Sequence, residues 1–250
     1  MEGPQIQLYA AQLRSLGGFS LVRLGGERRH VVADLRGHTF AEPIAFGKLL
    51  FLRFADHSKL LRLHCLMFGD IRINRTRPGK RLTLRMSMES GDKVYLYLGA
   101  ARLADADELD DTIRQRDIAG GKQPDPATLK RAAEALPNQM VCDALLDQQW
   151  FPGLGNKIKC EAMHHADVHP ATKMGDLNDE SIERLSEGVR GFTQHFESII
   201  FRDGDRGTPK YQIFRRRRCG RCDGPVKNEK LGDLQRSSHY CPNCQPVPRN

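Results

Sequence analysis

Four cysteines have the spacing of a metal site. They form two Cys-x-x-Cys pairs with 18 residues between the pairs: Cys219, Cys222, Cys241 and Cys244. Four thiolates suit a tetrahedral Zn²⁺, and pairs about 15–20 residues apart are the usual form of such a site. Two disulfides are the alternative, which a reducing compartment disfavours. The sequence therefore predicts one structural zinc ion, because four protein ligands leave no open position for catalysis.

A second segment, residues 150–161, has the composition of an anion site. Its glycine-rich turn, Pro152-Gly-Leu-Gly-Asn156, lies between two stretches predicted to be helices. Backbone N–H groups at the start of the second helix can bind phosphate, aided by the helix dipole. Asn156 adds a side-chain donor, and Lys157 and Lys159 add positive charge. A purely structural glycine turn between helices remains the alternative.

The charge of the chain favours a polyanionic partner. Its 250 residues include 39 Lys and Arg against 31 Asp and Glu, a formal net charge of +8. Cations concentrate at residues 72–85 and 210–221, whereas acidic residues cluster at 105–111. Separated basic segments are typical of nucleic-acid binding, with ordinary basic solubility as the alternative.

The sequence does not predict a membrane or secreted protein. It contains no stretch of about 18 apolar residues that could span a bilayer. The first 18 residues lack the basic and apolar regions of a secretory signal. We therefore expect a cytoplasmic, nucleoid-associated monomer without a signal peptide.

The first half of the chain has a β-rich pattern behind a leading helix. The helix is expected at residues 4–16, and short alternating segments follow from about residue 19 to residue 98. Two antiparallel hairpins are predicted there: 49–54 with 59–66, and 82–88 with 94–98. Several strands at this spacing suggest a small sandwich or barrel.

The second half has helical periodicity. An acidic, helix-like stretch at 104–117 precedes a turn-rich linker at 119–126. Four helical pieces follow, at 127–135, 139–148, 155–166 and 179–201. A polar loop at 202–210 then leads into the cysteine module at 211–245.

Six segments, spread over nearly the whole chain and in a consistent order, together resemble one enzyme family. They are Met1-Glu-Gly-Pro4, Phe46-Gly-Lys-Leu-Leu50, His64-Cys-Leu-Met-Phe-Gly69, Pro152-Gly-Leu-Gly-Asn156, Val168-His-Pro170 and Arg236-Ser-Ser-His-Tyr-Cys-Pro-Asn-Cys-Gln245. The chain resembles the formamidopyrimidine-DNA glycosylase/endonuclease VIII family of base-excision repair enzymes. Residues 80–111 are closer to the endonuclease VIII branch.

The resemblance implies an α+β fold in three parts. Residues 1–117 would form a helix-led antiparallel β-sandwich, and residues 127–210 a helical domain with a helix–two-turns–helix DNA-binding motif. Residues 211–245 would form a zinc finger with four cysteine ligands. The implied partner is double-stranded DNA containing damaged bases or abasic sites.

The resemblance also implies a reaction. The family flips a damaged nucleotide out of the duplex, because a base inside the stack is out of reach. The N-terminal amine attacks C1′ of the sugar, a Schiff base forms, and the base leaves. The strand is then cut by β- and δ-elimination. By position, the Met1 amine would be the nucleophile and Glu2 the acid/base, and Glu161 falls where the family has a residue near the active site.

Further residues would bind DNA. Lys48 and Asn156 would each bind a phosphate, and Arg236 would grip the phosphates flanking the flipped nucleotide. The apolar trio Leu66, Met67 and Phe68 would form the wedge that fills the vacated stack. Taken alone, Lys48 and Arg236 could be ordinary surface cations, and the apolar trio could lie in a buried strand.

The N-terminus departs from the family pattern. The family has proline directly after the initiator methionine, whereas Glu2 follows Met1 here, and Gln5 replaces a common second acidic residue. We expect Met1 to be retained because glutamate is too large for easy trimming. A primary amine still forms an imine, with a reference pKa of about 7.7–8.0. The secondary amine and the fixed backbone angle of proline are lost.

Three hypotheses follow. The chain is a glycosylase with AP lyase activity on damaged, oxidised bases or abasic sites, or it binds such DNA on the same scaffold with little or no catalysis. An unrelated zinc-containing nucleic-acid protein is the third. Retention of Glu2, Lys48, Asn156 and Arg236 favours the enzyme, and loss of the proline favours the binding protein.

Overall fold

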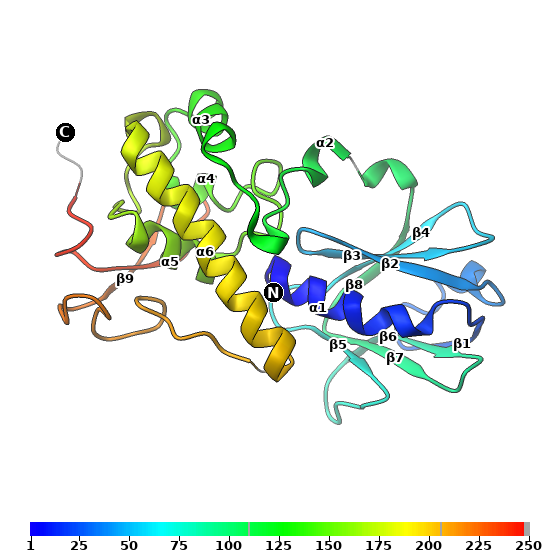
Figure 1. The fold of residues 1–250 in the computed structure, drawn as a ribbon. Helices are drawn as coiled ribbons and strands as arrows, with labels where there is room; N and C mark the ends of the chain where they lie inside the picture. Colours follow the sequence, from blue (N-terminus) through cyan, green and yellow to red (C-terminus); the bar gives the residue numbers. More distant parts are fainter. Residues whose placement is uncertain (110, 206, 248–250) are drawn as a thin grey trace. The chain divides into compact units, whose positions relative to one another are not determined.

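The computed structural model describes residues 1–109, 111–205 and 207–247. The chain divides into two compact units, Met1–Asp111 and Thr112–Asn250, which are coloured blue to green and green to red in Figure 1.

The first unit consists of a helix and two four-stranded antiparallel sheets, in the orders β1-β6-β7-β5 and β2-β3-β4-β8. Figure 1 shows the helix running beside both sheets. The elements are α1 (Gly3–Leu13), β1 (Leu21–Gly25), β2 (Phe40–Phe46), β3 (Leu49–Phe54), β4 (Leu60–His64), β5 (Asp70–Ile73), β6 (Leu82–Met88), β7 (Lys93–Tyr97) and β8 (Ala100–Ala104). Short 3₁₀ turns lie at Arg14–Leu16, Ala33–Leu35 and Ala106–Glu108.

One apolar core joins the helix and both sheets. Pro4 stands in the first turn of α1, where its missing N–H costs no hydrogen bond. The helix buries Ile6, Tyr9 and Leu13 against alternate residues of each sheet, such as Leu52 and Met86. Burial of one face of each sheet is what makes the pair a sandwich. The predicted helix-led β-sandwich is confirmed.

Both predicted hairpins are present. Strands β3 and β4 pair antiparallel with Leu49 opposite His64, and β6 pairs with β7 with Met86 opposite Val94. The strands β1, β2, β5 and β8 were not resolved as separate segments by the sequence pattern. They complete the two sheets.

The expectation of a helix over residues 104–117 is wrong. Strand β8 continues to Ala104, and after a 3₁₀ turn only the short helix α2 (Asp111–Arg114) forms. The stretch lacks an apolar stripe, and its acidic side chains bind strand residues instead: Glu108 accepts two hydrogen bonds from Arg102, at 2.7 and 2.5 Å. Asp110, part of the predicted acidic cluster, lies outside the described residues.

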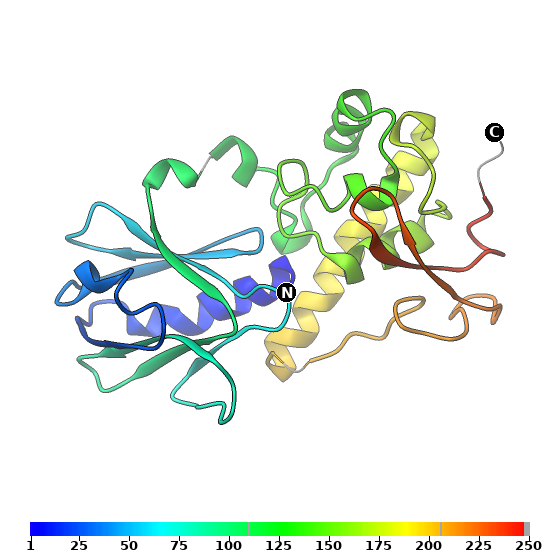
Figure 2. The ribbon, with the colours of Figure 1, turned by 180° about the vertical axis from the view of Figure 1, so that it is seen from behind.

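The second unit consists of helices and one hairpin. Its elements are α3 (Pro126–Ala135), α4 (Val141–Ala144), α5 (Asn156–His165), α6 (Asp179–Asp203), β9 (Lys227–Leu231) and β10 (Arg236–Tyr240), with 3₁₀ turns at Ala119–Gly121 and Met174–Asp176. Strands β9 and β10 pair antiparallel, and Figure 2 shows this hairpin, in dark red, beside α5, against which β10 packs.

Three of the four predicted helices are confirmed, as α3, α5 and α6. The fourth, expected at 139–148, is only the four residues of α4. The reason is Gln148, whose side chain donates to the carbonyls of Leu146 and Leu154 and accepts from the Gly153 N–H. These bonds favour a turn over continuation of the helix. None of the helices that the structure describes has the length and apolar character needed to cross a bilayer.

Candidate functional site

The N-terminus of the first unit holds a buried carboxylate. Glu2 is 3% exposed and caps helix α1. It forms a capping box with Gln5, in which the Glu2 N–H donates to Gln5 Oε1 at 3.1 Å. Met1 packs partly against the apolar core. The box therefore fixes the backbone that carries the N-terminal amine.

Positive groups gather near this amine. The pairing of Leu49 with His64 brings the turn residue Lys48 beside the end of β4. Burial lowers the pKa of His64, and the charges of Arg62, Lys48 and the N-terminal amine lower it further. Burial also raises the pKa of Cys65 to about 12, against the opposing charge of the amine. The amine and Lys48 therefore both contribute positive charge around His64, whose ring is kept neutral, and this positive charge suits an anion.

The three residues after Cys65 are apolar and face solvent. Leu66, Met67 and Phe68 are 45%, 58% and 73% exposed, so their interpretation as a buried strand is wrong. Gly69 fixes the base of this apolar loop. Its N–H donates to the Cys65 carbonyl at 2.8 Å, and a Cβ at Gly69 would lie only 2.3 Å from that oxygen. The loop is therefore short and tightly anchored.

In the second unit, Asn156 is the first residue of α5, directly after the N-cap Gly155. Its Oδ1 is buried and has no hydrogen-bond partner among the described residues. Lys157 and Lys159 were both expected to add positive charge at this helix end, and Lys159 does not. Lys157 Nζ lies 4.8 Å from the ring centre of Phe196, whereas Lys159 is fully buried and directed at β10.

The four predicted metal ligands come together. Their sulfur atoms all lie within 4.8 Å of one another. Cys219 Sγ is 3.9 Å from Cys244 Sγ, and Cys222 Sγ is 3.5 Å from Cys241 Sγ, far beyond a disulfide bond length of about 2.05 Å. The cluster can hold a metal ion. Arg236, exposed at the start of β10, belongs to the same module.

His164 is a neighbour of this cluster that sequence patterns did not single out. Its Nε2 lies 3.1 Å from Cys219 Sγ, and the ring is buried on α5. Burial lowers the pKa of His164 to about 4. A neutral imidazole N–H can donate to a metal-bound thiolate and orient it.

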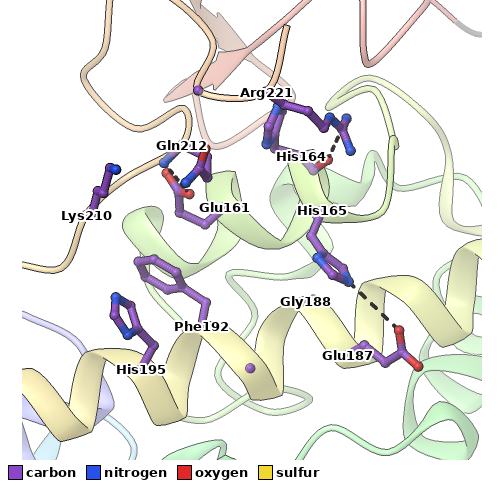
Figure 3. A pocket seen from close by; sticks show the side chains of 12 residues that line it. Glu161, His164, His165, Glu187, Gly188, Phe192, His195, Lys210, Gln212 and Arg221 are labelled. Atoms are coloured by element: carbon purple, nitrogen blue, oxygen red, sulfur yellow. Dashed lines mark hydrogen bonds and ion pairs between the residues drawn. The ribbon is translucent and has the colours of Figure 1, made fainter.

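Glu161 has a structural task. Its carboxylate accepts three backbone N–H groups, from Gln212 at 2.9 Å, Ile213 at 3.0 Å and Phe214 at 2.8 Å. In Figure 3 its side chain turns toward the segment that carries Gln212. This buried carboxylate therefore ties the entry of the cysteine module to α5.

A hollow of about 590 Å³ opens beside Glu161, between α5, α6 and residues 210–221. Figure 3 shows Phe192 and His195 on its α6 side and an ion pair between His165 and Glu187 at 3.9 Å. Arg221 on the opposite side is already bound to Asp167 and to the His164 carbonyl. Most charged groups of this hollow therefore already have a partner: His165 and Glu187 pair with each other, Arg221 binds Asp167, and Glu161 accepts backbone N–H groups.

Comparison with known proteins identifies the family. No family model matches the chain. Endonuclease 8-like 3 of Xenopus laevis is 31% identical over 228 residues, which are 86% of this chain and 36% of that protein. Formamidopyrimidine-DNA glycosylase of Roseiflexus sp. (strain RS-1) is 30% identical over 216 residues, which are 78% of this chain and 77% of that protein. The chain belongs to the formamidopyrimidine-DNA glycosylase/endonuclease VIII family.

The solved structures of this family have the same fold. The complex between the Lactococcus lactis Fpg and an abasic site containing DNA has a TM-score of 0.83 at 20% identity, covering 98% of this chain and 100% of that one. Family members also differ in length. The chain spans 36% of the Xenopus laevis relative, roughly a third of its length.

Proposed function

We propose that this chain is a base-excision-repair DNA glycosylase with AP lyase activity on oxidised bases or abasic sites in duplex DNA. The observation that carries the proposal is the positive charge of the N-terminal amine and Lys48 around His64, together with the buried Glu2 that follows Met1. A nucleophile, an acid/base and a phosphate-binding cation are the groups that such a reaction needs.

In the proposed reaction, the nitrogen of the Met1 amine attacks C1′ of an extruded nucleotide. The glycosidic bond breaks and the base leaves with its electron pair, taking up a proton. Glu2 protonates the opening sugar ring, and an imine joins Met1 to C1′. Loss of the C2′ proton then expels the 3′ phosphate, and a second elimination expels the 5′ phosphate.

The DNA contacts are proposed along the same lines. Lys48 and Asn156 would each bind a phosphate, and Arg236 would bind the phosphates beside the flipped nucleotide. The place of Asn156 as the first residue of α5 supports its role, because the backbone N–H groups of a helix N-terminus favour anions and its side-chain amide nitrogen can donate to a phosphate oxygen. The exposed loop of Leu66, Met67 and Phe68 has the apolar character of a wedge between bases.

We further propose that the ion of the cysteine cluster is zinc. Zinc–sulfur bonds of about 2.3 Å place tetrahedral ligands about 3.8 Å apart. The distance of 3.9 Å between the Cys219 and Cys244 sulfur atoms, and that of 3.5 Å between the Cys222 and Cys241 sulfur atoms, are close to this ligand–ligand separation. Cys219, Cys222, Cys241 and Cys244 would hold the ion, whose contribution is to fix the fold of the module.

A second function, damaged-DNA binding without catalysis, is favoured by two observations. Glu2 is engaged in the capping box with Gln5, so its use as an acid/base competes with helix capping. The proline that normally supplies the family nucleophile is also absent, because Glu2 follows Met1 directly.

Borohydride trapping separates the two functions. Zinc-loaded protein, with Met1 confirmed as its first residue by mass, is mixed with a duplex containing one abasic site and then reduced. A covalent complex mapping to Met1 supports the enzyme, and Glu2→Gln should slow strand cleavage at least tenfold. A chain extended by two residues at its N-terminus is the matched control and should not trap. Tight abasic-site binding without trapping would establish the binding protein instead.

A further inference from the structure

Lys159 is a charged residue without access to water. It lies on α5, one turn after Asn156, and is 0% exposed. Fully buried lysines are rare unless they are paired. Its Nζ donates to Ser238 Oγ at 2.9 Å and approaches the Ser237 carbonyl at 3.3 Å. The ammonium group therefore binds the strand β10 immediately after Arg236.

Asp143 binds the same hairpin from the other side of Arg236. It is 1% exposed, and its Oδ2 accepts the Leu234 N–H at 3.1 Å. A Cβ at Gly232 would collide with this carboxylate, so the turn backbone lies directly against it. Two buried, oppositely charged groups thus hold the chain at residue 234 and at residues 237–238, with Arg236 between the two anchors.

The metal cluster by itself cannot hold the part of the hairpin that carries Arg236. Arg236 precedes Cys241 by five residues of extended chain, a distance of about 17 Å at 3.4 Å per residue. The cysteines fix the base of the hairpin, and its tip needs its own support. Burial lowers the pKa of Lys159, and the nearby charge of Arg236 also lowers it. Lys159 contacts the carbonyl of Ser237, the residue directly after Arg236, so the anchor lies next to Arg236 along the strand.

We propose that Lys159, together with Asp143, is a positioning residue for Arg236, holding the hairpin tip so that the guanidinium meets a DNA phosphate. This inference rests on the proposed function of Arg236. A guanidinium–phosphate contact depends on the direction of its paired N–H groups, so a loosened strand weakens it without removing any group that touches DNA. Lys159 acts only through Ser237 and Ser238.

A double-mutant cycle tests the proposal. The zinc-loaded 250-residue chain is titrated with a duplex carrying a tetrahydrofuran abasic-site analogue, at several salt concentrations. Lys159→Met and Arg236→Ala should each weaken binding about tenfold to a hundredfold, the range expected for one charge-assisted hydrogen bond. The double variant should bind no more weakly than Arg236→Ala alone. In each single variant, the slope of the logarithm of affinity against the logarithm of salt concentration should also fall by the amount that corresponds to about one phosphate contact.

Controls separate positioning from folding and from general charge loss. The Lys159→Met variant must still bind one zinc ion per chain, and its far-ultraviolet circular dichroism spectrum must be unchanged. Should that variant unfold, Ser238→Ala removes just one bond of the anchor and should show a smaller effect that again vanishes in the Arg236→Ala background. Lys130→Met, a charge loss on α3, should leave affinity unchanged.

Each remaining outcome has a distinct meaning. Effects of Lys159→Met and Arg236→Ala that multiply in the double variant would overturn the positioning role, as would unchanged affinity of folded Lys159→Met. Unchanged affinity of Arg236→Ala would instead overturn the proposed DNA contact itself.

Discussion

The stability of the second unit should depend on the carboxylate of Glu161. Its Oε1 accepts the N–H groups of Ile213 and Phe214, and its Oε2 accepts that of Gln212, at 2.8–3.0 Å. Glu161→Gln keeps the size of the side chain. The amide oxygen can retain two of these bonds without the charge, and the amide nitrogen then faces the third N–H, donor against donor.

The cost follows from these bonds. Hydrogen bonds to a charged group contribute about 1.5–3 kcal/mol and neutral ones about 0.5–1.5 kcal/mol, and a buried donor without a partner adds about 1–3 kcal/mol. Allowing for partial relaxation, we expect Glu161→Gln to lower the free energy of unfolding by about 2–4 kcal/mol. With a urea dependence of about 2 kcal/mol per molar, the midpoint falls by about 1–2 M.

The assay can address this unit alone. Trp150 is the one tryptophan of the chain and lies in the second unit, so its fluorescence follows the unfolding of that unit. Urea titrations at equal zinc loading compare wild type, Glu161→Gln and the control Glu187→Gln. Glu187 is exposed and pairs with His165 at 3.9 Å, so its substitution should have little effect. Equal midpoints for the two variants would refute the anchoring role of Glu161.

Three further predictions concern other parts of the molecule. Phe68→Ala should change the free energy of unfolding by no more than about 0.5 kcal/mol, because the ring is 73% exposed. It should nevertheless reduce nucleotide flipping, measured as the fluorescence of 2-aminopurine placed opposite an abasic site. A large loss of stability would contradict the exposed position of the ring. Asp125 accepts the Thr128 N–H at 2.7 Å at the start of α3, and this bond lowers the pKa of the carboxyl group. A lowered carboxyl pKa stabilises the fold above the unfolded pKa of about 3.9 and ceases to do so as pH falls through the folded pKa. Asp125→Ala should therefore cost about 1 kcal/mol at neutral pH, with the difference from wild type shrinking in acid, whereas Asp125→Asn retains the cap. A difference that stays constant down to low pH would contradict the contribution of the carboxylate charge, and an unchanged free energy of unfolding in Asp125→Ala at neutral pH would contradict the cap itself. Chelation of the metal should unfold residues 211–245 and abolish DNA binding, measured by limited proteolysis and by titration; binding that survives chelation would contradict it.

Local patterns predicted much of this fold. The apolar periodicity of α3, α5 and α6 continues over ten or more residues in each helix, and such a signal survives tertiary packing. The cysteine spacing likewise predicted which atoms would meet. The acidic stretch failed because charged residues such as Glu108 have helix propensity but here bind a neighbouring strand.

The candidate site shows the opposite case. The approach of Lys48, His64 and the N-terminal amine depends on hairpin register and on where α1 begins, which no single segment encodes. The sequence shows that Lys159 is near Asn156 in the chain, and this alone suggested a cation at the helix end. The partners that bury it, Ser237 and Ser238, are distant in sequence, so no local pattern reveals them. Contacts of that kind are set by packing.

The apolar loop has a thermodynamic consequence. Leu66, Met67 and Phe68 are exposed to water, and the Gly69 N–H bond to the Cys65 carbonyl anchors the end of their loop. Any partner that covers them releases ordered solvent, so association should carry a negative heat-capacity change. The attraction between apolar surfaces weakens on cooling. Binding through this loop should therefore lose strength in the cold faster than binding through phosphate contacts.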